Sequence, residues 1–490
     1  MNFSYIDVII VIIYIVGVAA YGIYKGGKQK SARDYFISEK AIPWWAVCFA
    51  IVATETSALT FISIPGVAYV GNLNFLQIAI GYIIGRIVIS YLLLPKYFEG
   101  ELLTAYAYLG KRFGAKTKNF ASSVFMITRV FADGVRLYAT AIPLAIILKG
   151  FNIFTGAPDW QIYSISIIVM AVITLIYTYI GGVRAVIWTD VIQMFIYIGG
   201  GILALVILSG NIQTGFSGII SQLSEKGKLD FLNFSFDFTK PYTLIASVIG
   251  GGFLSMASHG TDQLIVQRLL TTNSLNKSQK ALIWSGIIVF FQFLLFLFIG
   301  SMLFIFFGGE QMKSDEVFPK FIISHMPSGV SGIIIAGLLA AAMSTLSGSI
   351  SALSSTLVED IYKPYFGKDK NEAQVLTVSR IIALFWCVLL ILSAFLFMNS
   401  SKAVVELGLS IASFTYGGLL GTFLLGIIFS RTKQIDALTG FITAIIVMVG
   451  VIYFTKIAWT WYTIIGVIVT LITANVVSLF SKKAKNSGVV

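Results

Sequence analysis

Ionisable side chains occur inside long apolar stretches of this sequence, where few charges are expected. Glu55 lies in the run AIVATETSALTF, and Arg129, Asp133 and Arg136 lie at positions i, i+4 and i+7 of the run VFMITRVFADGVRLYAT. This spacing puts the last three on one face of a helix. Charges at membrane depth are unfavourable unless they pair or face water, so each is a candidate for binding an ion or a solute. A purely structural salt network is the alternative, because buried charges normally pair.

The formal charges of these four residues cancel, and we expect them to form one neutral network before a solute arrives. A neutral site predicts a neutral or zwitterionic solute, such as a sugar or an amino acid. A simple anion would have to break the contact of Glu55 to reach an arginine. Arg86 and Asp190, the latter at the cytoplasmic end of its apolar run, are further candidates.

Two apolar runs are interrupted by polar residues at mid-depth. Residues 54–57, Thr-Glu-Thr-Ser, interrupt the run 43–71, and residues 258–262, Ser-His-Gly-Thr-Asp, interrupt the run 242–272. Interrupted helices in corresponding halves are typical of inverted-repeat secondary transporters, whose sites use unwound carbonyls and half-helix ends. The alternative is two merely polar helices packed in the bundle. His259, within the second interruption, is expected to be a hydrogen-bonded structural group.

A third apolar run is rich in hydroxyl groups. The stretch GIIIAGLLAAAMSTLSGSISALSS carries Ser344, Ser347 and Ser351 at helical spacing, with Thr345 alongside. Hydroxyls together with free carbonyls suit a hard cation such as Na⁺. A packing face of small residues is the alternative interpretation of the same pattern.

The elements that must position these groups are membrane helices. Of 490 residues, 57% are hydrophobic and 11% are charged, which nearly excludes soluble architectures. A bilayer-spanning helix needs about 20 apolar residues. The apolar runs predict thirteen helices, at 4–24, 43–71, 73–95, 119–148, 162–181, 186–209, 242–272, 280–308, 329–358, 374–398, 402–430, 436–455 and 459–480. The connections 210–242 and 310–327 are only loop-sized, so no catalytic domain is expected.

Positive charge predicts the orientation of these helices. With the N-terminus outside, the inner connections hold 22 of the 34 Lys and Arg residues and the outer ones 8, and the inner set includes Arg268. Cytoplasmic loops are enriched in Lys and Arg, so the C-terminus is expected inside as well. The first helix has its basic cluster after its apolar run, which predicts a retained anchor rather than a cleaved signal peptide.

Several function classes find no support in the sequence. There is no Gly-rich phosphate loop with its Lys, and His259 and His325 are too few for a metal site. No Ser/His/Asp arrangement suggests hydrolysis, and Cys48 and Cys387 are expected to be buried thiols. The net charge of +12 is explained by loop charges at the lipid bilayer, so no nucleic-acid partner is expected.

Four stretches together resemble the sodium:solute symporter family: ATETSALTFISIPGVAY, YIGGVRAVIWTDVIQ, DQLIVQR and AAAMSTLSGSISALSSTLVEDIY. The similarity runs through nearly the whole chain. It implies an all-α fold of the leucine-transporter type with one extra leading helix. The implied units of this single transporter domain are a leading helix at 4–24, five-helix repeats at 43–209 and 242–430, and two additional helices at 436–480.

The resemblance also implies site residues. The main sodium site of the family maps, through carbonyl and hydroxyl ligands, to Ala53, Thr56, Ala341, Ser344 and Thr345. Some members hold a second sodium ion, which maps to Asp190, Ser344 and Ser347. Gly348 stands where one more serine oxygen would lie, which departs from that second site.

Substrate groups in the family map to three spans, at Glu55, Ser57, Thr60, Phe75, Ala79, Ser255 and Ser258. Glu55 departs from the uncharged residue found in the sugar and sialic acid branches. The arginine that holds the sialic acid carboxylate maps to Ala132, with Arg129 and Arg136 on either side. No branch's substrate therefore transfers directly, and Arg129, Asp133 and Arg136 stay candidate substrate residues.

We therefore expect a sodium-coupled symporter, not an enzyme, that imports a small polar organic solute (a sugar, sugar acid or amino acid) by alternating access. Na⁺, the solute and the lipid bilayer are its expected partners, with no obligate protein partner and a multi-pass location in the plasma membrane, here a bacterial inner membrane. A monocarboxylate or other anion symporter of the same family is the alternative. A channel or a transport-like sensor is the rival from another class, although polarity collects at mid-depth and only a short tail follows the last span.

Overall fold

The computed structural model describes residues 4–39, 41–100, 102–150, 156–398 and 404–486, and this part of the chain is helical with no strand. Lys40, in a predicted inner connection, and Lys402, in a predicted outer one, lie outside the described residues. Nine helices of the described part are long and apolar enough to cross a membrane, and the bent pair α3 and α4 makes a tenth candidate span.

The long helices follow the predicted apolar runs closely. They are α1 (Tyr5–Gly26), α3 (Trp44–Glu55) with α4 (Ala58–Val70), α5 (Leu76–Leu92), α8 (Ala115–Gly150), α9 (Asp159–Asn211), α11 (Gly251–Gly260) with α12 (Gln263–Leu270), α13 (Leu275–Phe306), α15 (Val330–Thr356), α17 (Glu372–Leu396), α18 (Val404–Ile428), α19 (Gln434–Phe454) and α20 (Tyr462–Asn486). A span count of thirteen stays a prediction, because length and composition alone identify fewer.

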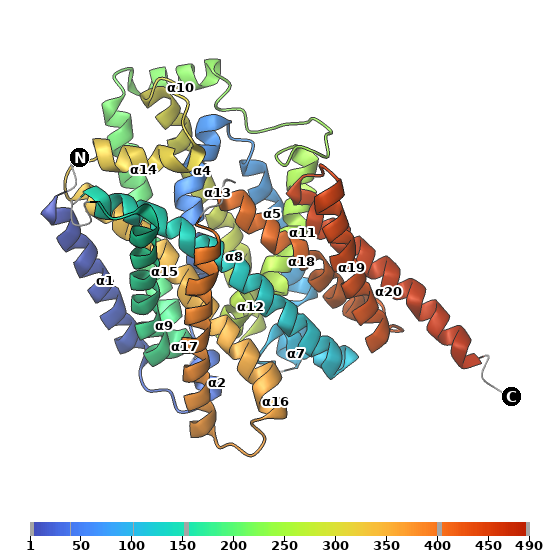
Figure 1. Ribbon diagram of the computed structural model, residues 1–490. Helices are drawn as coiled ribbons and strands as arrows, with labels where there is room; N and C mark the ends of the chain where they lie inside the picture. Colours follow the sequence, from blue (N-terminus) through green and yellow to red (C-terminus); the bar gives the residue numbers. More distant parts are fainter. Residues whose placement is uncertain (1–3, 40, 101, 151–155, 399–403, 487–490) are drawn as a thin grey trace.

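Shorter helices lie in the connections. They are α2 (Ala32–Phe36), α6 (Leu94–Glu99), α7 (Ala105–Phe113), α10 (Gly215–Glu225), α14 (Ser314–His325) and α16 (Lys363–Tyr365). The stretches 210–242 and 310–327, expected to be loops, therefore contain α10 and α14. In Figure 1, α10 and α14 lie at one end of the bundle and α2 and α16 at the other.

The predicted fifth and sixth spans are continuous in hydrogen bonding but kinked. Both lie in α9, and Gly182 interrupts it with φ 58° and ψ −161°. A side chain is unfavourable at this positive φ, and a Cβ there would lie 2.6 Å from the carbonyl oxygen of Tyr35. Glycine thus allows the chain to turn between two apolar segments, as the sequence pattern predicted.

Among the candidate membrane spans of the described residues, the most buried is the one that contains α15, the hydroxyl-rich helix. Its residues from Ile334 to Thr356 are all buried, and it packs against α9, α1, α8, α3 and α17. By contrast, α19 and α20 lie at one side of the bundle and α1 at the opposite side (Figure 1). A buried α15 places its serines and threonines in the interior, away from the lipid-facing surface.

The leading helix is joined to the start of α15 through one carboxylate. Asp7 is fully buried, and its Oδ1 accepts the backbone amides of Gly329 at 2.8 Å and Gly332 at 2.7 Å. The first amides of a helix lack intrahelical partners, and an anion there is favourable. Asp7 therefore connects the extra helix α1 to the helix that carries the hydroxyl groups.

Candidate functional site

The break between α3 and α4 frees two backbone carbonyls. The Ser57 amide donates to the carbonyl of Glu55 at 3.0 Å, and the Thr60 amide donates to that of Ser57 at 2.9 Å. In a continuous helix these amides would bond to the carbonyls of Ala53 and Thr56. The two carbonyls predicted as sodium ligands have therefore lost their helical partners, because the backbone leaves the helix at Thr56 (φ −77°, ψ 81°).

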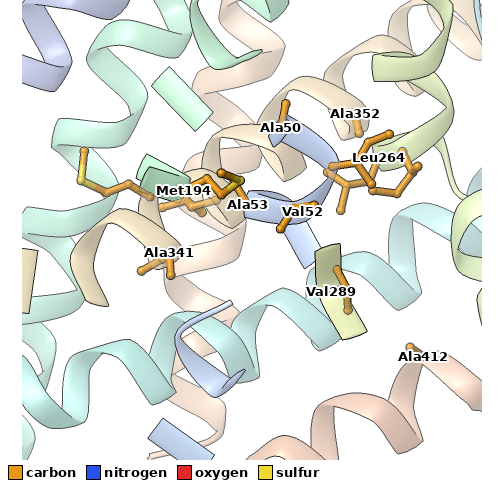
Figure 2. Close-up of a cluster of buried hydrophobic side chains, with 14 of the residues drawn as sticks. Ala50, Val52, Ala53, Met194, Leu264, Val289, Ala341, Ala352 and Ala412 are labelled. Atoms are coloured by element: carbon orange, nitrogen blue, oxygen red, sulfur yellow. The ribbon is translucent and has the colours of Figure 1, made fainter. Parts of the chain in front are cut away.

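Hydroxyl groups of α15 lie beside this break. The Thr345 hydroxyl donates to the carbonyl of Thr54 at 3.3 Å and to that of Ala341 at 3.1 Å, and it is buried. Ala53 and Ala341 belong to the buried apolar core around this point (Figure 2). Residues of both predicted sodium-ligand segments thus meet, and these residues are buried.

A cavity opens next to the break. Among the predicted substrate residues its lining includes Glu55, Ser57, Thr60, Phe75, Arg129, Arg136 and Ser258. The remaining lining comes from side chains that the sequence did not single out as substrate residues, including Thr54, Tyr82, His259, Phe293 and Tyr416. The lining therefore combines polar and charged groups with aromatic side chains, as suits a small polar organic molecule.

Three predicted substrate residues lie outside this lining. The Ser255 hydroxyl is fully buried and donates to the carbonyl of Tyr82 at 3.0 Å. Ala79 is buried as well. Asp133 lines a smaller adjoining space with Ser57, Arg136 and Thr345. None of the three therefore lines the main cavity in this structure.

The predicted pairing of Glu55 is wrong. Its carboxylate forms an ion pair with Arg86 of α5, and His259 Nε2 lies 3.5 Å from the same carboxylate oxygen. Among the described residues, Glu55 forms no ion pair with Arg129 or Arg136. The Arg86 guanidinium is fully buried and also donates to the Ser285 hydroxyl at 2.7 Å. The helix register that brings Arg86 to Glu55 is set by packing and cannot be read from one sequence.

The charged face of α8 forms a second network, as its spacing predicted. Asp133 lies 3.3 Å from Arg129 and 3.2 Å from Arg136. Arg129 also forms an ion pair with Asp262, at the break between α11 and α12, and donates to the Tyr416 hydroxyl at 2.9 Å. The Tyr416 hydroxyl in turn donates to Asp262 at 2.5 Å. This network joins the second broken helix to α8 and α18.

Arg136 is the arginine of this site that retains the most freedom. Its side chain is 19% exposed, against 5% for Arg129 and none for Arg86. Its Nη1 donates to Asp133 at 3.2 Å, and its Nε has no hydrogen-bond partner within the described residues. A guanidinium carries five N–H donors. Arg136 can therefore receive a carboxylate at the cavity without breaking the Glu55 ion pair.

Asp190 and Arg268 form a third pair that the sequence did not predict. Asp190 was expected at the end of its span and Arg268 in a cytoplasmic loop, but their side chains are only 0% and 1% exposed. Arg268 Nη2 lies 3.0 Å from Asp190 Oδ2. The Ser344 hydroxyl donates to Asp190 Oδ1 at 2.6 Å. Ser347 is buried on the same helix and donates to the carbonyl of Ser344 at 3.0 Å.

The second helix break lies slightly later than predicted. The stretch 258–260 stays in α11, and the chain leaves the helix at Thr261 and Asp262. Asp262 caps α12 by accepting the Leu264 amide at 2.8 Å. The sequence could have predicted that Asp262 caps a helix, because Asp before an apolar run is a typical helix N-cap. No pattern in the sequence indicates that Asp262 pairs with Arg129.

Two broken helices, freed carbonyls, buried hydroxyls and a polar cavity between them define an ion-coupled membrane transporter. Comparisons with known proteins identify the family within this class of transporter. A family model for the sodium:solute symporter family matches residues 35–444. The chain belongs to this family.

Its relatives include bacterial transporters of similar length. The chain is 29% identical to the sodium/sialic acid symporter NanT of Aliivibrio fischeri, covering 99% of this chain and 95% of the relative. It is 27% identical to the sodium/sialic acid symporter SiaT of Proteus mirabilis, covering 99% and 97%.

Solved structures agree with this assignment. A Na⁺-coupled sialic acid symporter in a substrate-bound outward-open state superimposes with a TM-score of 0.88 at 27% identity, covering 98% of each chain. The nucleobase-cation-symport-1 transporter Mhp1 shares the fold alone, with a TM-score of 0.58 at 13% identity, over 93% of this chain and 96% of Mhp1. The protein is a membrane-spanning, sodium-coupled symporter of a small polar organic solute.

Proposed function

We propose that the coupled sodium ion binds between the α3 break and α15, on the carbonyls of Ala53, Thr56 and Ala341 and the hydroxyls of Ser344 and Thr345. The observation that supports this site most directly is the contact of the Thr345 hydroxyl with the α3 break, at 3.3 Å from the carbonyl of Thr54. All five proposed ligands are neutral carbonyl or hydroxyl oxygens, which suit a hard monovalent cation. Sodium bound there would favour the arrangement of α3 and α15 that the solute also needs.

We further propose that the solute carries a carboxylate and several hydroxyl groups, as a sugar acid does. Arg136 would receive the carboxylate, and Ser57, Thr60 and Ser258 would bond the hydroxyl groups. A neutral solute is expected only if an anion must displace Glu55 from an arginine of α8. Glu55 pairs with Arg86 instead, so a carboxylate can approach Arg136 while that ion pair stays intact. The sialic acid symporters among the relatives act on a solute of this chemistry.

The charges around the cavity are compatible with this proposal. Three carboxylates and three guanidiniums pair there: Glu55, Asp133 and Asp262 with Arg86, Arg129 and Arg136. One sodium ion and one carboxylate would add a positive and a negative charge. The bound state would then stay neutral, which a low-dielectric site favours.

The number of spans, their orientation and their arrangement in repeats are also proposed. We infer thirteen spans, an outside N-terminus, an inside C-terminus and two inverted five-helix repeats, at 43–209 and 242–430. Each repeat would begin with a broken helix, α3–α4 in the first and α11–α12 in the second. The protein would act in the bacterial inner membrane as a transporter without enzymatic activity or an obligate protein partner.

Uptake by proteoliposomes tests the proposal. Purified protein should accumulate radiolabelled N-acetylneuraminate under an inward sodium gradient and should not do so under a potassium gradient. Unlabelled sugar acids should compete better than glucose or proline. Gradient-driven uptake that glucose or proline inhibits best would disprove the carboxylate proposal and leave the symport itself intact.

A further inference from the structure

The pair of Asp190 and Arg268 includes a residue, Asp190, that maps through the family resemblance to the second sodium site of some members. Asp190 and Ser344, two residues that map to that second site, are in contact here. Arg268 comes from the end of α12, and its Nε and Nη2 lie 3.3 and 3.0 Å from the same oxygen of Asp190. The position next to the carboxylate is therefore taken by a positive charge of the chain itself.

Both oxygens of Asp190 are satisfied by protein groups. Oδ1 accepts the Ser344 hydroxyl, and Oδ2 accepts the Arg268 guanidinium. A sodium ion needs lone pairs directed toward it, whereas these groups direct N–H and O–H bonds toward the carboxylate. A second cation would also lie beside a buried guanidinium, in a setting where like charges repel strongly.

The guanidinium of Arg268 fits beside Asp190 because Gly348 has no side chain. A Cβ at this position would lie 2.4 Å from Arg268 Nη2 and 3.0 Å from Nη1. Those atoms are the far end of a flexible side chain, so a larger residue would push the guanidinium aside. The absence of a serine at 348 therefore has two effects, because it removes a sodium ligand and makes room for Arg268.

Arg268 is held in this position from its own helix as well. Its Nη1 donates to the carbonyl of Leu264 at 2.7 Å, one turn earlier in α12. A side chain bonded both to its helix and to Asp190 has little freedom to leave while an ion enters. The residues present do not fit a second sodium ion, even though several of that site's ligands remain.

We propose that Arg268 is a tethered cation that neutralises Asp190 in place of a second sodium ion, so that each solute molecule is coupled to one sodium ion. This inference rests on the proposed function, since it concerns the ion stoichiometry of the same symport. Without a membrane potential, a tenfold sodium gradient would then support roughly a tenfold solute gradient, against roughly a hundredfold for two ions.

The test compares two substitutions at one position. Gly348→Ala displaces the guanidinium without adding an oxygen, whereas Gly348→Ser displaces it and adds a hydroxyl ligand. Dual-isotope flux of ²²Na⁺ and labelled solute in proteoliposomes gives the coupling ratio. Sodium titration of the purified protein by thermal shift reports sodium binding independently of transport, because a ligand bound only by the folded state raises its apparent stability.

The expected result is a ratio of one for the wild type, and for Gly348→Ser a ratio approaching two with a second sodium-dependent rise in stability. Gly348→Ala exposes Asp190 without adding the hydroxyl ligand, so its second rise in stability should be weaker than that of Gly348→Ser. A wild-type ratio of two would overturn the inference while leaving the symport in place. Gly348→Ser with one sodium ion would overturn it as well. Failure of the proposed function gives a different result, namely no sodium-driven solute flux in the wild type.

Should Gly348→Ser fail to fold, Arg268→Met offers an independent variant. It removes the tethered charge and keeps an apolar side chain of similar length, which leaves Asp190 open to a cation. Thermal-shift titration should then show stabilisation by sodium well beyond that of the wild type. Equal sodium stabilisation of the two proteins would mean that the pair is purely structural.

Discussion

Replacing Arg136 with Gln should weaken binding of a carboxylate-bearing solute and spare the fold. Asp133, its present partner, keeps Arg129 at 3.3 Å and also accepts the Ser349 hydroxyl. The carboxylate of Asp133 therefore keeps a guanidinium partner after the change, although Arg129 then serves both Asp133 and Asp262. The uncharged Gln amide can still donate a hydrogen bond to Asp133, which favours an intact cavity wall.

The expected loss of solute affinity follows from the hydrogen bond that Arg136→Gln removes. A hydrogen bond to a charged group contributes about 1.5–3 kcal/mol, which corresponds to a roughly 10- to 150-fold rise in the dissociation constant. The partly exposed position of Arg136 favours the lower part of this range. Because the effect depends on the carboxylate, the methyl ester of the same solute should bind the wild type and Arg136→Gln almost equally.

Sodium-dependent binding of the acid and its ester, measured by intrinsic fluorescence in detergent, checks this prediction. Arg129→Gln is the matched control, because Arg129 pairs with both Asp133 and Asp262. Its loss leaves buried carboxylates short of a partner and should lower stability by about 3–5 kcal/mol. Equal losses of acid and ester affinity in Arg136→Gln would refute a direct contact between Arg136 and the carboxylate.

Two further predictions concern the other parts of the site. Thr345→Ala should raise the sodium concentration for half-maximal uptake many-fold without unfolding the protein, and an unchanged sodium dependence would exclude Thr345 as a ligand. Glu55→Gln should lower the melting temperature, because it leaves the buried Arg86 guanidinium without its carboxylate, and breaking such a pair costs about 3–5 kcal/mol. An unchanged melting temperature would show that Arg86 finds another partner.

The sequence predicted those features that depend on local pattern. Apolar runs gave the long helices, and the polar interruption at 54–57 marked the break that the structure has between Glu55 and Ala58. The i, i+4, i+7 spacing on α8 gave the contacts of Asp133 with its two neighbouring arginines. Each of these features is set within a few turns of one helix, so a single sequence carries the information.

Pairings between distant helices could not be predicted in the same way. Arg86 reaches Glu55 because α5 packs closely on α11, where a Cβ at Gly85 would lie 2.3 Å from the carbonyl oxygen of Gly252. This close approach of Gly85 to Gly252 fixes the register of α5. The two glycines are more than 150 positions apart in the chain, so a single sequence does not show that they meet. Arg268 was counted among loop charges for a related reason, since burial against α9 and α15 depends on tertiary packing.

The central claim of this account is that sodium and the solute favour the same arrangement of the broken helices. Thermodynamic linkage then requires sodium to raise the solute affinity by the same factor as the solute raises the sodium affinity. Isothermal titration of the purified protein with N-acetylneuraminate at low and saturating sodium, and with sodium at low and saturating N-acetylneuraminate, measures both factors. The account predicts two equal factors well above one, and a solute affinity that does not change with sodium would contradict it.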